Sequence, residues 1–515
     1  MPDTFTAAAP ADNEKVRHIT LPARDRAAPF LLAALVALAG LTAFAPAPGL
    51  RGVAPSGLLR DFNAFYCAGR SLDAGADPYR AEPLGSCERE FKPAPLMAGT
   101  PGLAMPAPLP PYALVPFALL ARFTFGIAAI LWSLLLLSCT VVTIVGMRRL
   151  TGLPATMVTA AFVLSEGYAA LCLGQIAPLA VASIVLAARL LAARRDALAG
   201  LVAALSMFEP HVGLPVCLAL FAWRPRTRVP LLAAALACLA ISVAVAGPAT
   251  TLEYVRAVVP AHAMSEIANE KQLSLTYALH RLGASDGLAV RAGDLWYLGM
   301  LVLGIGAAGL ALRRGLGAEF VAALPPLFAL VGGPFVHVVQ MPAALPAALL
   351  LYARATGATR AILGVGVAAL AVPWIQFANL GTSFDGLAAL VCAILTFSMI
   401  DRRPLAAAGA AIAAIVFLAA ATAAVQTRIG DAGAALAARY DPRALAEASW
   451  TTYIAAIGSA NAFAFDLAKV PTIVALLALA CCALAELRPA KTHERLPTIA
   501  STGNGGDASR RIALR

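Results

Sequence analysis

The stretch ALAGLVAALSMFEPHVGLPVCLALFAW, residues 197–223, decides the fold, because its interpretation sets the direction of every later helix. It is apolar except where Glu209-Pro210-His211 interrupts it. Each half is too short to cross about 30 Å of hydrocarbon comfortably as an untilted helix. We therefore predict a hairpin of two short helices with Pro210 at its tip, which enters and leaves the membrane on the same side.

The distribution of arginine supports this interpretation. Only a hairpin places every short arginine-bearing connection on one side, since a single crossing at 197–223 would invert all later loops. These arginines are Arg148, Arg149, Arg194, Arg195, Arg224, Arg226, Arg228, Arg313, Arg314, Arg354, Arg360, Arg402 and Arg403. By the positive-inside rule this side is cytoplasmic, and so are the tails 1–29 and 488–515. We expect no cleavable signal before the first span.

Composition agrees with a polytopic, all-α membrane protein. Of 515 residues, 60% are hydrophobic and only 13% are charged, with a mean hydropathy of +0.79. The net charge of +11 does not indicate nucleic acid as a partner, because the basic residues punctuate apolar runs instead of forming one basic face. With the hairpin, we predict about 12 to 14 transmembrane helices in one membrane domain, 30–487. The other predicted spans are 30–49, 124–147, 154–173, 176–193, 229–247, 294–312, 318–334, 337–353, 360–379, 384–400, 405–425 and 469–487.

Three longer segments, 50–123, 248–293 and 426–468, then lie on the extracytoplasmic side. Within the first, the Pro-led stretch 106–123 predicts an in-plane helix. Polar groups at or inside a membrane are costly, which makes them functional candidates. Those predicted on this side are Asp61, Gln175, Glu209, His211, Lys271, Arg281 and His337.

The first of these segments contains RDFNAFYCAGRSLDAGADPY, residues 60–79. Aromatic and apolar residues recur there at helical spacing, so 62–74 predicts an amphipathic helix that Gly75 can end. Asp61 then falls at the N-cap. Asp61 either only caps the helix or also acts as a base. The two roles are compatible, because capping would keep the carboxylate ionised and oriented.

Four motifs in order resemble glycosyltransferase family 87, over about residues 55–345. The first comprises Asp61, Phe62, Ala68, Gly69, Arg70, Asp77, Pro78 and Tyr79, and the second is Gly174-Gln175. The third is Gln272-Leu273-Ser274-Leu275 with Arg281, which is similar to the family's N-Q-S-L segment with two polar positions changed. The fourth is His337 in GGPFVH. The resemblance implies a GT-C-like bundle.

The resemblance also implies an activity: inverting transfer of a hexose such as mannose from a polyprenyl-phosphate donor to an extracytoplasmic lipid or glycan acceptor, in the plasma (inner) membrane. Asp61 would be the catalytic base. The candidates for the donor phosphate and substrate are Lys271, His337, Arg281, Arg70, His211, Gln175, Gln272 and Ser274. Glu209-Pro210 stands where the family often has Lys-Pro, so no donor contact is transferred to Glu209.

Simpler roles stay open for several of these residues. Arg70 can snorkel to lipid headgroups, His337 can bond a carbonyl at a helix end, and Gln175 can cap a turn at Gly174. Cys67 and Cys87 share the outer segment and are either a disulfide or two free thiols, whereas the other seven cysteines lie in apolar spans.

Neither a metal nor a cofactor is expected. The six histidines lack ligand spacing, and no Gly-rich phosphate loop follows a strand. Asp73 and Asp77 can be read as a metal pair, but Asp77-Pro78 is better explained as a turn.

Two other function classes remain possible. A lipid or sugar transporter or flippase would explain the prolines Pro325, Pro326, Pro342 and Pro346 as helix breaks, although the chain has no two-fold repeat and its polar residues lie on one face. A non-catalytic envelope assembly protein that retains the fold would explain the departures at Glu209 and Leu273.

Overall fold

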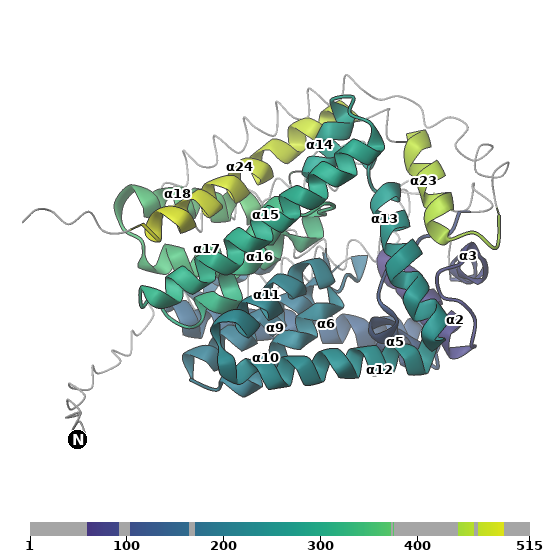
Figure 1. The fold of residues 1–515 in the computed structure, drawn as a ribbon, viewed down its shortest axis with the longest axis horizontal. Helices are drawn as coiled ribbons and strands as arrows, with labels where there is room; N and C mark the ends of the chain where they lie inside the picture. Colours follow the sequence, from purple (N-terminus) through teal and green to yellow (C-terminus); the bar gives the residue numbers. More distant parts are fainter. Residues whose placement is uncertain are drawn as a thin grey trace, which may run out of the picture.

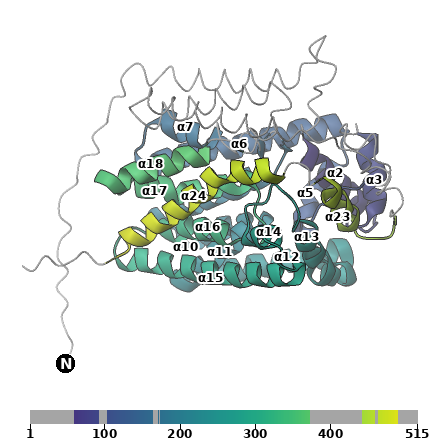
Figure 2. The ribbon, with the colours of Figure 1, turned by 90° about the horizontal axis from the view of Figure 1, so that it is seen from above.

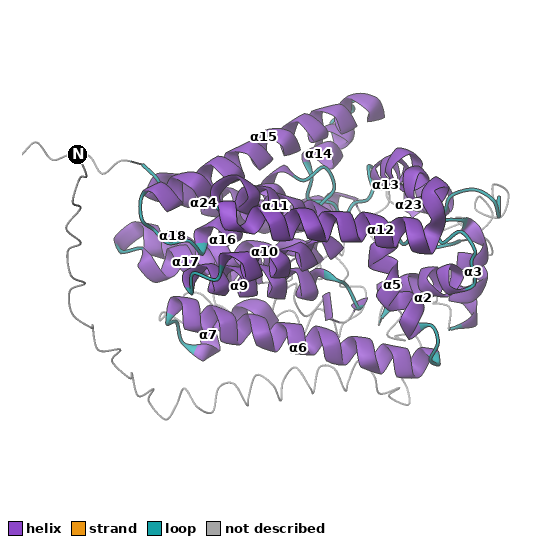
Figure 3. Ribbon diagram, turned by 60° about the horizontal axis from the view of Figure 1, so that its bottom comes forward, coloured by secondary structure: helices purple, strands orange, loops and turns teal. Residues whose placement is uncertain are grey.

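The computed structural model describes residues 59–91, 103–163, 170–171, 173–371, 374, 441–457 and 462–488. Every regular element in these ranges is a helix, apart from one isolated bridge between Arg80 and Leu445 (Figure 3). The predicted all-α class is therefore confirmed for this part of the chain.

Four described helices are long and apolar enough to cross a membrane. They span Phe125–Thr151 (α6), Pro225–Ser265 (containing α12, Arg228–Glu253), Asp286–Arg313 (α15) and Phe465–Glu486 (within α24, Ala462–Glu486). The shorter apolar helices are α5 (Pro111–Leu120), α7 (Ala155–Val163), α9 (Ala177–Ala192), α16 (Phe320–Gly332), α17 (Leu345–Arg354) and α18 (Gly357–Ala371), beside the hairpin below. The predicted spans 30–49, 384–400 and 405–425 lie outside the described residues, so the total of 12 to 14 stays a prediction.

The hairpin predicted for 197–223 is present. Its first arm is α10 (Asp196–Ala204) with the 3-10 turn η1 (Leu205–Phe208), and its second arm is α11 (Pro210–Trp223). Gly213 packs on the backbone of Ser206, where a Cβ would come within 2.4 Å of the Ser206 carbonyl. At the open end of the hairpin, Arg224 donates hydrogen bonds to both carboxylate oxygens of Asp196, at 2.7 and 2.8 Å. The chain therefore returns to where it entered the hairpin.

The arginine-bearing connections meet at one end of the bundle. Arg194, Arg224 and Arg226 line a common cavity with Asp196 and Glu319, and Arg354 pairs with Glu319 at 2.6 Å. We call this the arginine end; it lies in the left half of Figure 1. Between the two ends, α16 and α17 are almost fully buried and form the centre of the apolar core with α9.

The opposite end gathers α2 (Arg60–Asp73), α3 (Ala81–Glu90), α5, α13 (Val259–Ser265) and α23 (Ala446–Ile457), on the right of Figure 1. We call it the loop end. The short helix α14 (Leu275–Arg281) follows α13 in the chain, and Figure 2 shows both on the same side of the molecule. A kink at Gly247, whose φ of 78° suits glycine, separates the long apolar part of α12 from this region.

Contacts join the three predicted extracytoplasmic segments. Ser449 exchanges hydrogen bonds with the backbone of Ala104, and the Tyr254 hydroxyl donates to the Pro108 carbonyl at 3.2 Å. Cys67 and Cys87 form a disulfide that ties α2 to α3, which resolves the alternative left open by the sequence. The helix predicted over 62–74 runs from Arg60 to Asp73, and Gly75 ends it with a φ of 71°.

Candidate functional site

The central contact of the loop end joins Asp61 to Gln175. The Gln175 Nε2 donates to Asp61 Oδ2 at 2.5 Å, and Arg60 Nε lies 3.7 Å from Asp61 Oδ1. The predicted N-cap position of Asp61 is wrong: the cap residue is Leu59, and Asp61 lies in the first turn without a capping hydrogen bond. Its side chain is 15% exposed and is held by tertiary contacts instead.

The turn before Gln175 favours a glycine at position 174. Gly174 has a φ of 72° and packs on Phe62, where a Cβ would lie only 2.6 Å from the Phe62 Cβ. The indole of Trp132 donates to the Gly174 carbonyl at 2.8 Å, and the Gln175 amide donates to Ala170. Because backbone groups close this turn, the Gln175 side chain is free to reach Asp61.

A second group surrounds Glu266, a buried carboxylate at the end of α13. It accepts hydrogen bonds from Trp450, Asn269 and Gln272, and its Oε2 lies 3.4 Å from His337 Nε2. Burial alone would raise the pKa of Glu266, but the neighbouring imidazoles and these hydrogen bonds lower it below its usual value. Glu266 therefore stays ionised and orients His337.

The segment that carries the predicted Gln272 and Ser274 is fixed by its own bonds. Gln272 Oε1 accepts from the Val336 amide at 2.6 Å, and its Nε2 lies 2.9 Å from His337 Nε2. The Leu273 amide donates to the Val336 carbonyl. Ser274 caps α14 by accepting from the Tyr277 amide at 3.2 Å. Gln272 thus acts on His337 directly, whereas Ser274 shapes the loop.

Lys271 lies in the same loop, and Asp61 is among the charged groups that act on it. Burial and the nearby Arg60 guanidinium lower the pKa of Lys271, and the carboxylates of Glu270, Asp61 and Glu266 oppose this effect only in part. Its Nζ lies 5.7 Å from the centre of the Phe465 ring. The adjacent Glu270 is buried, and its Oε2 has no hydrogen-bond partner among the described residues.

The tip of the hairpin reaches this cluster. Glu209 accepts from Gln340 at 2.8 Å, and Gln340 in turn accepts from the His337 amide at 3.0 Å. His211 lies 3.5 Å from the Glu209 carboxylate. The hairpin therefore brings His211 into the same network as His337.

Arg281 takes part in a neighbouring set of contacts around Asp466. This carboxylate lies 3.3 Å from Arg281 and 3.1 Å from Lys469, and it accepts from the Tyr277 hydroxyl at 2.7 Å. The buried Lys469 Nζ also lies 3.6 Å from the centre of the Tyr277 ring. Arg281 is thus already paired, beside the Lys271 loop.

Arg70, predicted as a phosphate ligand, contacts none of these residues. It pairs with Glu90 at 2.7 Å, with both side chains about half exposed, and lies over the Phe91 ring. The neighbouring Gly69 has a packing role: it allows α2 to touch the backbone of Phe117 in α5.

The two aspartates that can be read as a metal pair, Asp73 and Asp77, each form a salt bridge. Asp73 contacts Arg122 at 2.9 Å, and Asp77 bonds Arg80 and accepts from the Tyr79 amide, as expected of a turn. Although His211 and His262 both pack on Phe335, the described residues contain no group of three or more side chains suited to a metal ion.

Sequence reasoning missed four participants: Arg60, Glu266, Glu270 and Lys469. Arg60 is the neighbour of Asp61, and Glu266 and Glu270 precede Lys271 in one loop, so chain proximity was an available signal for three of them. No such signal pointed to Lys469, because it is the first residue of the predicted span 469–487.

The assembled site has a carboxylate, Asp61, beside two cations, Arg60 and Lys271, and an imidazole, His337, held by Glu266. A carboxylate can accept a proton and the cations can stabilise a phosphate, so the arrangement suits transfer from a phosphorylated donor.

Comparison with known proteins bears on this interpretation. The family model of glycosyltransferase family 87 matches residues 109–332, which include Gln175, Glu209, His211, Lys271, Gln272 and Arg281. Neither the curated proteins nor the solved structures contain a match. With its apolar helices and this match, the chain is a membrane protein that is similar over residues 109–332 to glycosyltransferase family 87, a family of membrane glycosyltransferases.

Proposed function

We propose that the chain transfers a hexose, such as mannose, from a polyprenyl-phosphate donor to a lipid or glycan acceptor on the extracytoplasmic face of the plasma membrane. The contact between Asp61 and Gln175 carries the proposal. It joins two motifs far apart in the chain, and the charge of the half-buried Lys271 acts on the same carboxylate.

The chemistry uses few groups. The acceptor hydroxyl oxygen attacks the anomeric carbon, Asp61 takes its proton, and the bond between that carbon and the phosphate oxygen breaks. The electron pair leaves with the polyprenyl phosphate. Lys271 and His337 stabilise the charge that develops on this leaving group, and Arg60 reinforces the field near Asp61. Attack opposite the leaving phosphate inverts the anomeric configuration.

The placement of the cluster favours an enzyme over a transporter. Its members gather at the loop end, whereas transporter sites typically lie near the bilayer midplane between repeats. The paired prolines Pro325 and Pro326 lie within α16, which remains one continuous helix.

Turnover of a radiolabelled polyprenyl-phosphate hexose in membranes tests the proposal. Membranes that contain the chain should release polyprenyl phosphate and form a labelled acceptor product, and membranes with Asp61→Asn should not. Donor movement between leaflets without cleavage would instead identify a flippase. Absence of cleavage by both proteins, with several hexoses offered, would contradict the proposal.

A further inference from the structure

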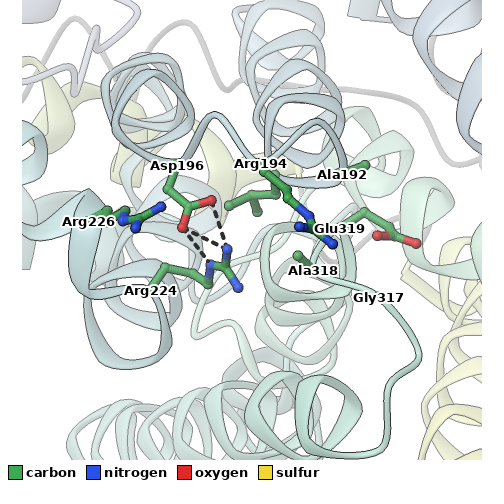
Figure 4. A pocket seen from close by; sticks show the side chains of 9 residues that line it. Ala192, Arg194, Asp196, Arg224, Arg226, Gly317, Ala318 and Glu319 are labelled. Atoms are coloured by element: carbon green, nitrogen blue, oxygen red, sulfur yellow. Dashed lines mark hydrogen bonds and ion pairs between the residues drawn. The ribbon is translucent and has the colours of Figure 1, made fainter. Parts of the chain in front are cut away.

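A basic cavity lies at the arginine end, away from the Asp61 cluster. It has a volume of about 340 Å³, is open on one side and is lined by the end of α9, the start of α10, the 3-10 turn η2 (Pro225–Thr227) with the preceding Arg224, and the residues before α16. Figure 4 shows Arg194, Arg224, Arg226, Asp196 and Glu319 around it. The proposed transferase reaction uses none of these residues.

Both acidic side chains of the cavity are already paired. Asp196, which is 7% exposed, is held by Arg224, and Glu319 bonds Arg354 at 2.6 Å. The dashed contacts in Figure 4 accordingly join only Arg224 and Asp196 among the residues drawn. The carboxylates therefore have little capacity left to neutralise further cations.

Two arginines of the cavity, Arg194 and Arg226, are unpaired among the described residues. Neither has a hydrogen bond or ion pair from its side chain within the described residues, and both are exposed. Three arginines against two acids give the lining a charge of +1, and Arg354 behind Glu319 raises the local excess to +2. The free positive charge lies on Arg194 and Arg226.

The backbone at Arg194 strengthens this observation. Arg194 has a φ of 57°, a left-handed conformation at the end of α9 where glycine is the favoured residue. The sequence places a long cationic side chain there instead, at the wall of the cavity. Two guanidinium groups at one cavity suit a phosphate, because each can donate paired hydrogen bonds to its oxygens.

The surroundings indicate an amphiphilic ligand. The helices that leave the cavity, α10 and α12, carry exposed apolar side chains directly after it: Leu198, Leu201, Val229 and Leu232. We propose that the cavity binds the phosphate headgroup of an anionic membrane lipid, with the acyl chains along these two helices. Basic pockets between membrane helices are known to hold such headgroups.

Binding of fluorescent phosphatidylglycerol to the full chain in neutral detergent tests the proposal, with fluorescent phosphatidylcholine as the neutral comparison. The variant R194Q/R226Q should weaken phosphatidylglycerol binding by roughly tenfold or more, since two charge-assisted contacts are lost. The matched control R149Q/R314Q removes two exposed arginines that do not line the cavity and should bind within about twofold of the unaltered chain.

Three results would overturn the proposal: unaltered binding by R194Q/R226Q, an equal loss in R149Q/R314Q, or displacement of the lipid by inorganic phosphate at the same concentration. The last would identify a soluble phosphate as the ligand. If the double variant is unstable, R194Q and R226Q alone should each show an intermediate loss of affinity. Their unfolding temperatures without lipid report on folding.

Discussion

The side chains of Asp61 and Gln175 meet across 114 positions of sequence, through a 2.5 Å hydrogen bond. The contact involves only one of the two Asp61 carboxylate oxygens, and the other lies 3.7 Å from Arg60. A carboxylate oriented in this way keeps lone pairs available for a proton.

Asp61→Asn tests whether this carboxylate is a base. Asparagine keeps an oxygen that can accept from Gln175 but cannot take the acceptor proton, so folding should survive while transfer falls by roughly 10² to 10⁴. The measurement is turnover of a polyprenyl-phosphate hexose, paired with an unfolding midpoint. Near-normal turnover by a stable variant would leave Asp61 with a structural role only. If the Asn variant misfolds, Asp61→Glu provides the test.

Replacement of Lys271 or His337 by Ala should weaken use of the donor by ~2 to 4 kcal/mol for each residue, if both stabilise the leaving phosphate. Arg70→Ala is the matched control, because Arg70 is exposed and paired with Glu90 on the surface. The measurement is kcat/KM for the donor. Unchanged values for both Lys271 and His337 variants, or an equal loss for Arg70→Ala, would remove the phosphate assignment.

Glu88 should make stability depend on pH. Burial raises the pKa of Glu88 from 4.5 to about 8, although a hydrogen bond from the Met105 amide opposes this. The folded state therefore holds a proton that the unfolded state has lost between these values. The stabilisation is complete below the ordinary pKa and is lost as pH rises through about 8, at ~1.4 kcal/mol per pH unit.

The test compares unfolding midpoints at about pH 6 and about pH 9 under non-reducing conditions. The unaltered chain should be less stable at the higher pH. Glu88→Gln can still accept the Met105 hydrogen bond and should lose most of this difference. The same pH response in both proteins would assign the effect to other groups.

The side of each end can be tested by cysteine labelling. By the arginine distribution, Arg314→Cys should be protected from a membrane-impermeant thiol reagent in intact cells. Ala74→Cys, exposed at the loop end, should react. Thr227 is fully buried and would not report on either side. The reverse labelling pattern would invert every assignment of sidedness.

Much of the site could be predicted from sequence where the residues that determine a local structure lie close together in the chain. Helix 60–73, the Asp77 turn and the hairpin at Pro210 follow from local spacing, since turn chemistry and span length act over few residues. Lys469 could not be assigned in this way, and for Glu266 the proximity to Lys271 in the chain does not reveal its partners. Their roles arise from contacts with Trp450 and Tyr277, which lie almost two hundred positions away in the chain.

Arg70 shows that a motif match alone does not place a side chain in the site. It lies inside a matching motif, yet the helix turns its side chain toward Glu90 and away from Asp61. A motif match shows only that certain residues follow one another in the sequence. Helical geometry determines which of them lie on the same face of the helix. The Gly69 beside it is explained by packing on α5.

The clamp between Asp196 and Arg224 also bears on how the chain can change over evolution. A hairpin whose two ends are locked together adds an even number of passes, or none, to the path of the chain. Its arms can therefore lengthen, shorten or exchange residues at the tip without reversing the helices that follow. Glu209 stands at such a tip, so a new side chain can be tried there while the orientation of the rest of the molecule is preserved.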